Sequence, residues 1–328
     1  MAKVHCLTVG NGDCTLIEHA SGRVTMVDIC GGNRTRQRNE SSSNYMATAL
    51  TREKVRGNFA MCNSPTNPLD YIQNNRLTNI FRFILTHPDM DHMDGFNNLM
   101  NIASVSNFWD SGAKKDKPSF SGSPYNESDW DRYIKVRDGK EDGTTSSRRL
   151  AGSEFMYANS DDQGGGGDFI SIASPDATLI DSANEKQEFN DASYILVYRS
   201  AGGKIVIPGD SEDNSWEYAL NHHKELLRDV KFLLAPHHGR DSGRDRSFLN
   251  HLNPTLSLLG CAPSKDLAYD AWSNRNLDYV TQNQVGNMVL DIRSGAIDIY
   301  IESENFAEKS GGDTSRTNSQ GYFYLDTI

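Results

Sequence analysis

The sequence predicts a layered α/β fold in which helices cover β-sheets and polar side chains gather at one edge of the strands. Two observations support this prediction. In both halves of the chain, short apolar runs typical of buried strands alternate with segments of helical periodicity. Three of these runs lead directly into aspartate or histidine, so the chemistry of the protein is expected at the strand ends.

The first elements along the chain predict an antiparallel meander of three strands. Residues 4–9, 14–18 and 24–29 are apolar or alternate in polarity, as strands do. The turn at residues 10–13 is rich in glycine and asparagine, a composition that favours a tight hairpin between the first two strands.

The middle of the chain contains one predicted strand, residues 81–86, followed by a helix over residues 93–103 with one apolar face. Two polar segments, 33–66 and 111–167, flank this pair. They are predicted to be insertions in a single domain that spans residues 1–328.

Each predicted insertion carries side chains that suit a nucleic-acid ligand. The first contains Arg34, Arg36 and Arg38 and is either a solvated loop, which is favoured, or a flap that contacts phosphates. The second holds five aromatic residues that either anchor it to the core, which is favoured, or stack on bases. These residues are Tyr125, Trp130, Tyr133, Phe155 and Tyr157.

The second half of the chain repeats the alternation of strands and helices. A hairpin is predicted first, and a buried strand and closing strands follow, with a helix on each side of the buried strand. The predicted strands are residues 193–199, 203–208, 230–235, 255–260 and 287–301, and the predicted helices are residues 212–223 and 245–252.

The ends of three strands carry residues that bind metals. A charged cluster after a buried strand has no packing purpose, and the sheet fixes the backbone that presents it. Histidine nitrogen and aspartate oxygen together suit zinc, manganese or iron, so a metal site is predicted. The residues are His87, Asp89, Asp91 and His92 after the first strand, Asp210 after the second, and His237 and His238 after the third.

Composition limits the class of protein further. The 328 residues carry a formal net charge of -11, which argues against binding nucleic acid through overall basicity. No apolar run approaches the roughly 18 residues of a membrane span, so no membrane partner is expected. The five cysteines are odd in number and form no CxxC pair. They favour reduced thiols and a cytoplasmic location.

The run HPDMDH at residues 87–92 resembles the HxHxDH motif of the metallo-β-lactamase superfamily, with aspartate in place of the second histidine. HxDxDH is typical of the branch represented by the metal-hydrolase domain of the competence DNA-uptake protein ComEC. The chain looks like a standalone relative that lacks the transmembrane channel. Other blocks similar to that branch are VGNGD at residues 9–13, VDICGG at 27–32, FNDASYILV at 189–197, GDSE at 209–212 and PHHG at 236–239.

The resemblance implies an αββα sandwich of two mixed β-sheets flanked by helices. It also implies a centre with two divalent ions, zinc or manganese. Asp28 would hydrogen-bond a ligand histidine and fix its tautomer. The implied ligands are His87 and Asp89 for one ion, Asp91, His92 and His238 for the other, and Asp210 as the bridge.

The chain departs from the family at one ligand of the first ion. The family usually has a histidine just before the strand at residues 193–197, where this chain has Asn190 and Asp191. Either one of these residues substitutes as a ligand, or only one ion binds tightly.

The predicted activity is hydrolysis by a metal-activated hydroxide, because bound cations lower the pKa of water and stabilise charge on the reacting group. Asp91, Asp210 and His237 are the expected catalytic residues, with His237 either a proton donor or a packed neighbour. The favoured function is a phosphodiesterase or nuclease that acts on DNA. The alternatives are a hydrolase of a small molecule (cyclic nucleotide, lactone, thioester or β-lactam) and a binding module with a degenerate metal site.

Overall fold

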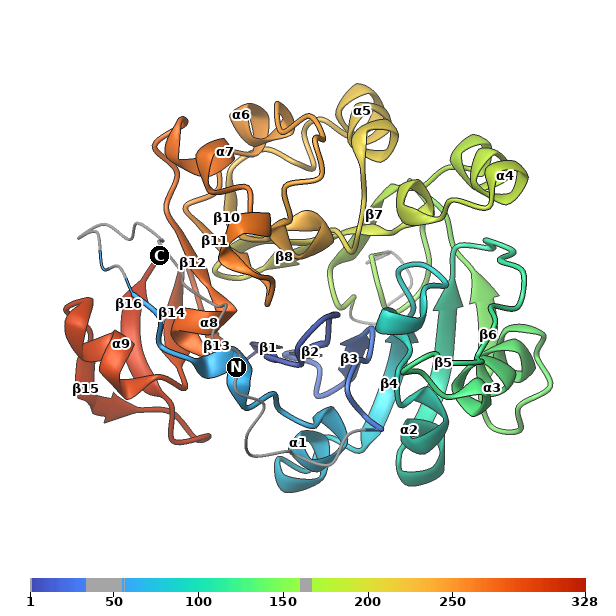
Figure 1. Ribbon diagram of the computed structural model, residues 1–328, viewed down its shortest axis with the longest axis horizontal. Helices are drawn as coiled ribbons and strands as arrows, with labels where there is room; N and C mark the ends of the chain where they lie inside the picture. The colour runs from blue at the N-terminus through green and yellow to red at the C-terminus, as the bar shows by residue number, and fades with distance from the viewer. Residues whose placement is uncertain (1, 34–54, 56, 160–166) are drawn as a thin grey trace.

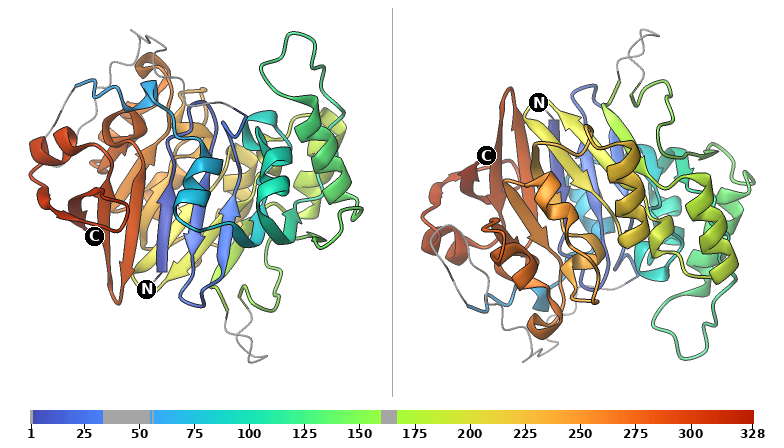
Figure 2. Two further views of the ribbon diagram at one scale, coloured as in Figure 1. Left: turned by 90° about the horizontal axis from the view of Figure 1, so that it is seen from below. Right: turned by 90° about the horizontal axis from the view of Figure 1, so that it is seen from above.

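The computed structural model describes residues 2–33, 55, 57–159 and 167–328. Two β-sheets pack face to face in the middle of the molecule, and helices lie on the outer side of each sheet (Figure 1). Views from below and above show the helices that cover each outer face (Figure 2). The predicted sandwich of two mixed sheets flanked by helices is therefore confirmed.

The described residues form ten strands in the first sheet. In spatial order they are β15 (Asp313–Thr317), β16 (Phe323–Thr327), β14 (Ala296–Ile301), β13 (Met288–Arg293), β1 (Ala2–Cys6), β2 (Thr15–Glu18), β3 (Val24–Val27), β4 (Asn79–Ile84), β5 (Ser104–Asp110) and β6 (Thr145–Arg148). The pairs β1–β2 and β2–β3 are antiparallel, which confirms the predicted meander. From β3 to β6 the strands run in parallel, so their carboxyl ends lie at one edge.

The second sheet contains six strands within the described parts of the chain. In spatial order they are β12 (Tyr279–Thr281), β11 (Leu256–Leu259), β10 (Val230–Leu234), β9 (Gly203–Ile207), β8 (Ile195–Ser200) and β7 (Ile170–Ser174). β8 and β9 form the predicted antiparallel hairpin. β9, β10, β11 and β12 are parallel, so this sheet also gathers its carboxyl ends at one edge.

Helices bury apolar side chains against both outer faces. Below the first sheet lie α1 (Pro68–Asn74), α2 (Phe96–Ile102) and α3 (Glu127–Arg137); above the second lie α5 (Asp213–His222), α6 (Phe248–Leu252) and α7 (Tyr269–Ser273). α4 (Ala177–Lys186) packs on the turn Asn190–Ala192, and α8 (Gln282–Val285) and α9 (Glu304–Lys309) pack beside the closing strands. Among the described residues, no helix is long and apolar enough to cross a membrane.

The second predicted insertion is built into the first sheet. α3 packs on α2, and β6 pairs with β5. Trp130 and Tyr133 are buried there, which confirms the predicted anchoring of the segment to the core for these two rings. In the first predicted insertion, residues 34–54 and 56 lie outside the described residues. The predicted substrate contacts Arg34, Arg36 and Arg38 are among them.

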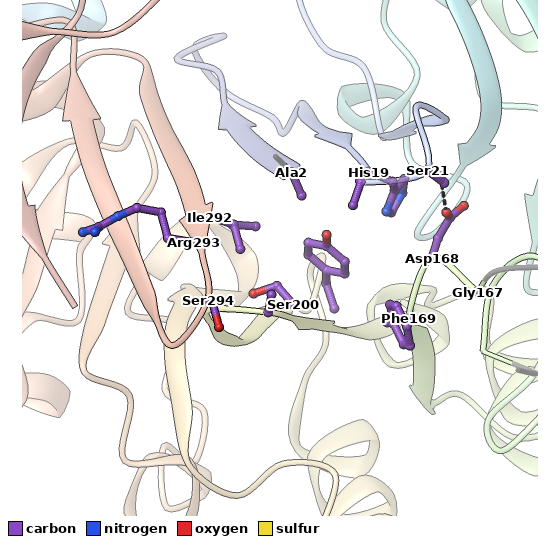
Figure 3. A pocket seen from close by; sticks show the side chains of 13 residues that line it. Ala2, His19, Ser21, Gly167, Asp168, Phe169, Ser200, Ile292, Arg293 and Ser294 are labelled. Carbon is purple, nitrogen blue, oxygen red and sulfur yellow. Dashed lines mark hydrogen bonds between the residues drawn. The ribbon is translucent and has the colours of Figure 1, made fainter.

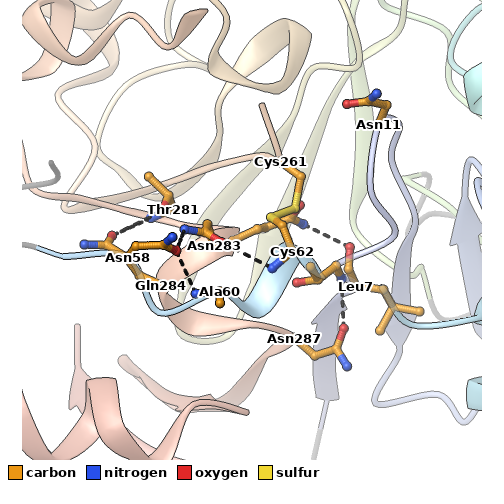
Figure 4. Close-up of a disulfide and its surroundings, with 12 residues drawn as sticks. Leu7, Asn11, Asn58, Ala60, Cys62, Cys261, Thr281, Asn283, Gln284 and Asn287 are labelled. Atoms are coloured by element: carbon orange, nitrogen blue, oxygen red, sulfur yellow. Dashed lines mark hydrogen bonds between the residues drawn. A yellow bond between two sulfur atoms is a disulfide. The ribbon is translucent and has the colours of Figure 1, made fainter. Parts of the chain in front are cut away.

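The structure corrects the prediction of five reduced thiols. Cys62 and Cys261 form a disulfide, with 6.0 Å between their Cα atoms (Figure 4). They are 199 positions apart in the sequence, so only the fold reveals the pair. The bond joins the turn Met61–Asn63 to the segment that follows β11. The other three cysteines are buried thiols.

Candidate metal centre

Strand ends from both sheets meet at one edge of the sandwich, which we call the metal edge. β4 leads into residues 87–92, β9 into Asp210 and β10 into His238. The ring centroids of His87 and His92 lie 4.2 Å apart, and those of His92 and His238 lie 5.6 Å apart. The fold thus brings together three segments, and the first of them lies more than a hundred residues before the other two in the sequence.

His92 is oriented by a buried carboxylate. Its Nδ1 lies 2.8 Å from Asp28 Oδ2, and Asp28 in turn accepts hydrogen bonds of 2.7 Å from the backbone N–H and the hydroxyl of Thr86. A carboxylate only accepts hydrogen bonds, so Nδ1 carries the proton and Nε2 is left as the ligand atom. Asp28 lies at the contact that the resemblance implies for it.

His238 has a matching carboxylate that sequence reasoning did not identify. Its Nδ1 lies 3.2 Å from Asp13 Oδ1. Asp13 follows Gly12, whose missing side chain allows the turn to approach closely: a Cβ at Gly12 would lie 2.3 Å from the carbonyl oxygen of Asp91. The sequence signal was an aspartate after a glycine turn at the carboxyl end of a strand, the same arrangement that marked Asp210.

Three ligand atoms converge between these oriented histidines. Asp210 Oδ1 lies 3.3 Å from His92 Nε2 and 3.5 Å from His238 Nε2. All three atoms are buried without a hydrogen-bond partner, so neither close approach is itself a hydrogen bond. Ligands about 2.0–2.2 Å from a tetrahedral ion lie roughly 3.3–3.6 Å from one another. The three atoms therefore fit a metal ion placed between them.

The charges at this point favour a cation. Burial raises the pKa of Asp210, but the effect of His238 and His92 is larger and in the opposite direction. They hold the pKa of Asp210 well below its usual range. Burial lowers the pKa of His238, and Asp210 and Asp13 outweigh that effect and raise the pKa to about 9. The attraction of the carboxylates for positive charge is thus larger than the cost of burying that charge at His238. A proton or a metal ion is therefore stabilised between the carboxylates and the imidazoles. Among the described residues, Asp13, His92, Asp210 and His238 form a group whose ligand atoms all lie within 4.8 Å of one another.

The residues expected for the other ion are less well assembled. His87 is buried, its Nε2 has no hydrogen-bond partner, and it lies 3.9 Å from Asp89 Oδ2, but among the described residues this pair belongs to no larger ligand group. Asp89 instead forms an ion pair with Lys115, with 2.6 Å between Nζ and Oδ1. Asp91 lies on the side of His238, with 4.0 Å between Oδ2 and Nε2.

The two residues that stand in place of the family histidine use their polar groups elsewhere. Asn190 donates a 2.9 Å hydrogen bond to Glu212. Asp191 accepts a hydrogen bond from the backbone of Ser215 in the first turn of α5. His237 lies between Asp210 and Glu212, at 3.7 Å and 3.9 Å, on the open side of the centre. Burial lowers the pKa of His237, which favours the neutral imidazole.

Two cavities differ in their relation to this centre. A polar cavity of about 580 Å³ adjoins it and is lined by Asp89, Lys115, Asn190, Glu212 and Arg244, among others. A mainly apolar cavity of about 320 Å³ lies at the opposite edge of the sandwich (Figure 3). Of the described residues that line it, Asp168 is the one with a carboxylate, and it accepts hydrogen bonds from Ser21 at 2.7 Å and from Arg23 at 2.8 and 2.9 Å. The candidate site is therefore the metal edge with its polar cavity.

No protein-family model matches the chain, and no curated protein matches it by sequence. Among solved structures, it is similar to the metallo-beta-lactamase fold protein YhfI from Bacillus subtilis, with 11% identity, a TM-score of 0.47, and 85% of this chain and 95% of that chain covered. A diphosphatase from the PhnP family gives 11% identity, a TM-score of 0.42, and 90% and 99% covered. CmlA, a diiron β-hydroxylase from Streptomyces venezuelae, gives 11% identity and a TM-score of 0.43, with 88% of this chain and 54% of that chain covered. At these values the chemistry rests on the geometry of the site itself.

Proposed function

We propose that this protein is a metal-dependent hydrolase of phosphodiester bonds. The observation that carries the proposal is the convergence of His92 Nε2, His238 Nε2 and Asp210 Oδ1, three buried ligand atoms without hydrogen-bond partners. The spacing favours zinc over manganese, because it matches tetrahedral ligation at zinc distances. A divalent ion held there supplies an activated water and neutralises charge on a phosphoryl oxygen.

The residues around the centre have separate tasks in this proposal. Asp28 and Asp13 hold the two imidazoles in the tautomer that binds a metal, and Asp210 contributes the negative charge. His237 is a titratable side chain on the open side of Asp210, and the neutral form that burial favours can accept a proton. We therefore assign it two transfers: it accepts a proton from the attacking water and then returns that proton to the leaving group.

A phosphodiester is proposed because three cationic side chains in the lining of the adjoining cavity, Lys115, Lys186 and Arg244, can contact its phosphate. The lining also holds four carboxylates (Asp89, Glu188, Asp191 and Glu212), and Asp89 and Glu212 form ion pairs with Lys115 and Arg244. DNA is the proposed substrate, in keeping with the ComEC-like motif HxDxDH. A small diester such as a cyclic nucleotide is the second candidate, because a cavity of about 580 Å³ has the size of a small-molecule site.

The test combines metal analysis with a panel of substrates. The purified protein is analysed for zinc and manganese and incubated with single- and double-stranded DNA, bis-p-nitrophenyl phosphate and nitrocefin. We expect metal-dependent cleavage of DNA and of the diester, and loss of both in Asp210→Ala and His238→Ala. His222→Ala is the matched control, because His222 is exposed on α5. A protein that binds no metal after zinc or manganese is added excludes the enzyme; cleavage of the diester with intact DNA favours the small substrate.

The cytoplasm is the proposed location, and the Cys62–Cys261 disulfide is the observation that opposes it, because disulfides persist mainly in oxidising compartments. Mass spectrometry of the protein, alkylated in its native cells before lysis, distinguishes the two cases. Free thiols at both positions support the cytoplasm, and a disulfide excludes it.

A further inference from the structure

We propose that the metal edge binds one ion and that the ammonium group of Lys115 takes the place of a second. The proposal rests on the proposed function and adds to it a positioning residue that the family resemblance does not supply. Lys115 would hold the positive charge next to Asp89 and present it to the anionic substrate.

The first argument is that the residues expected for a second ion do not form a ligand set. His87 Nε2 and Asp89 Oδ2 lie 3.9 Å apart, but no third histidine, cysteine or acidic side chain among the described residues completes a ligand group with them. The position of the missing family histidine is taken by Asn190, whose amide donates to Glu212. Of the residues that the structure describes, one group has ligand spacing, and neither His87 nor Asp89 belongs to it.

The second argument is that Lys115 already neutralises the carboxylate that the second ion would use. Its Nζ lies 2.6 Å from Asp89 Oδ1, a short charge-assisted contact. A divalent ion on Asp89 would have to displace this ammonium group or lie against it, and like charges at such a distance repel.

The third argument is that the structure holds Lys115 in place. The backbone N–H of Lys114 donates to Asn184 at 2.6 Å, and that of Asp116 donates to Gln187 at 3.0 Å. The ammonium group also lies 5.5 Å from the ring centroid of Phe189. A lysine fixed from both sides on the wall of the polar cavity is suited to contact an entering phosphate.

Glu212, the other carboxylate near this side, is engaged in the same way. Arg244 lies 2.5 Å from it, and Asn190 donates to its second oxygen. The half of the centre that faces the cavity therefore carries carboxylates already paired with side-chain cations, whereas Asp210 faces imidazoles. This division supports one metal ion beside a fixed organic cation.

The test is a metal titration of the whole protein with zinc, followed by equilibrium dialysis and elemental analysis. We expect one tightly bound ion in the wild type. In Lys115→Met we expect a second ion to bind at least about tenfold more tightly than any second ion in the wild type, because Asp89 and His87 become available. Lys115→Arg keeps the charge and should remain at one ion. Lys114→Met is the matched control, because Lys114 is exposed and adjacent.

Each outcome decides the proposal. Two tight ions in the wild type would overturn it, and so would a Lys115→Met protein whose affinity for a second ion does not change. Circular dichroism establishes that each variant is folded, and Lys115→Gln replaces Lys115→Met if that variant does not fold. A wild type that binds no ion excludes the proposed function itself, which separates the two failures. As a kinetic readout, the rate of Lys115→Met should depend on a second equivalent of zinc, and the rate of the wild type should not.

Discussion

Two buried carboxylates at opposite edges of the sandwich are balanced in different ways. Asp168 accepts hydrogen bonds from Arg23 and Ser21, and the buried guanidinium of Arg82 lies 3.3 Å away. Asp210 is equally buried, but its Oδ1 has no hydrogen-bond partner and faces two imidazoles whose other nitrogens are already used.

The difference supports a structural role for the edge that contains Asp168 and the proposed metal binding at the edge that contains Asp210. A buried charge is costly unless a counter-charge and hydrogen bonds compensate it. At Asp168 the chain supplies the counter-charge itself. At Asp210 it supplies ligand atoms in the arrangement of a cation site, so the compensation has to come from a bound ion or from protons on the histidines.

The largest expected effect on stability is at the opposite edge. Asp168→Ala leaves the buried guanidinium of Arg82 without its counter-charge, which costs about 3–5 kcal/mol of the free energy of unfolding. Zinc affinity should stay unchanged, because the substitution is remote from the metal edge. Urea unfolding with chelator present measures the first quantity and dialysis the second. Asp181→Ala, an exposed carboxylate on α4, is the control. A loss of zinc affinity in Asp168→Ala would mean that the two edges are coupled.

Metal removal should have the next largest effect on stability. This effect should depend on the residues of the metal edge and not on Asp168. An ion whose free concentration is roughly 100 to 1,000 times its Kd stabilises the folded protein by about 3–4 kcal/mol. Chelation should therefore lower the melting temperature of the wild type and of Asp168→Asn by the same increment. The melting temperature of Asp210→Ala should be the same with and without chelator. A chelator-sensitive Asp210→Ala protein would contradict the assignment of Asp210 as a ligand.

The carboxylates behind the histidines should have a smaller effect. Asp28→Asn and Asp13→Asn keep the size of the side chain but weaken the orientation of His92 and His238, so each should reduce zinc affinity about 10–100-fold. Asn tolerates the left-handed backbone of residue 28, where φ is 56°, so the fold should persist. Asp89→Asn should leave the affinity for the first ion unchanged. Equal losses in all three variants would contradict the division of the centre into two unequal halves.

The sequence predicted those parts of this picture that depend on local pattern. Apolar runs that end in His92, Asp210 and His238 are visible without a fold, because a strand and the ligand that follows it are neighbours in the chain. β6, with the sequence TSSR, has no apolar pattern and was not predicted, because it is defined by its pairing with β5.

Contacts between distant segments could not be predicted. Asp13 reaches His238 over 225 positions, and Cys62 is joined to Cys261 over 199. Lys115 lies at the start of a polar segment predicted to be an insertion, and its importance is visible only once Asp89 is beside it. Sequence pattern therefore indicated the proposed ligands, and the structure was needed to find the residues that we propose orient or replace them.

The smallest expected effect is the acid dependence of the opposite edge. Burial raises the pKa of Asp168, but Arg23, His19 and Ser21 outweigh it, so the folded-state pKa is lowered. A carboxyl with a lowered folded-state pKa stabilises the protein above its unfolded pKa of about 3.9, and this contribution is lost as the pH falls. With chelator present, the stability of the wild type should therefore decrease more steeply between about pH 5 and pH 3 than that of Asp168→Asn. If the two curves of stability against pH are parallel, Asp168 is not stabilised as a charged group by its contacts. The contrast between Asp168 and Asp210 would then be wrong for Asp168.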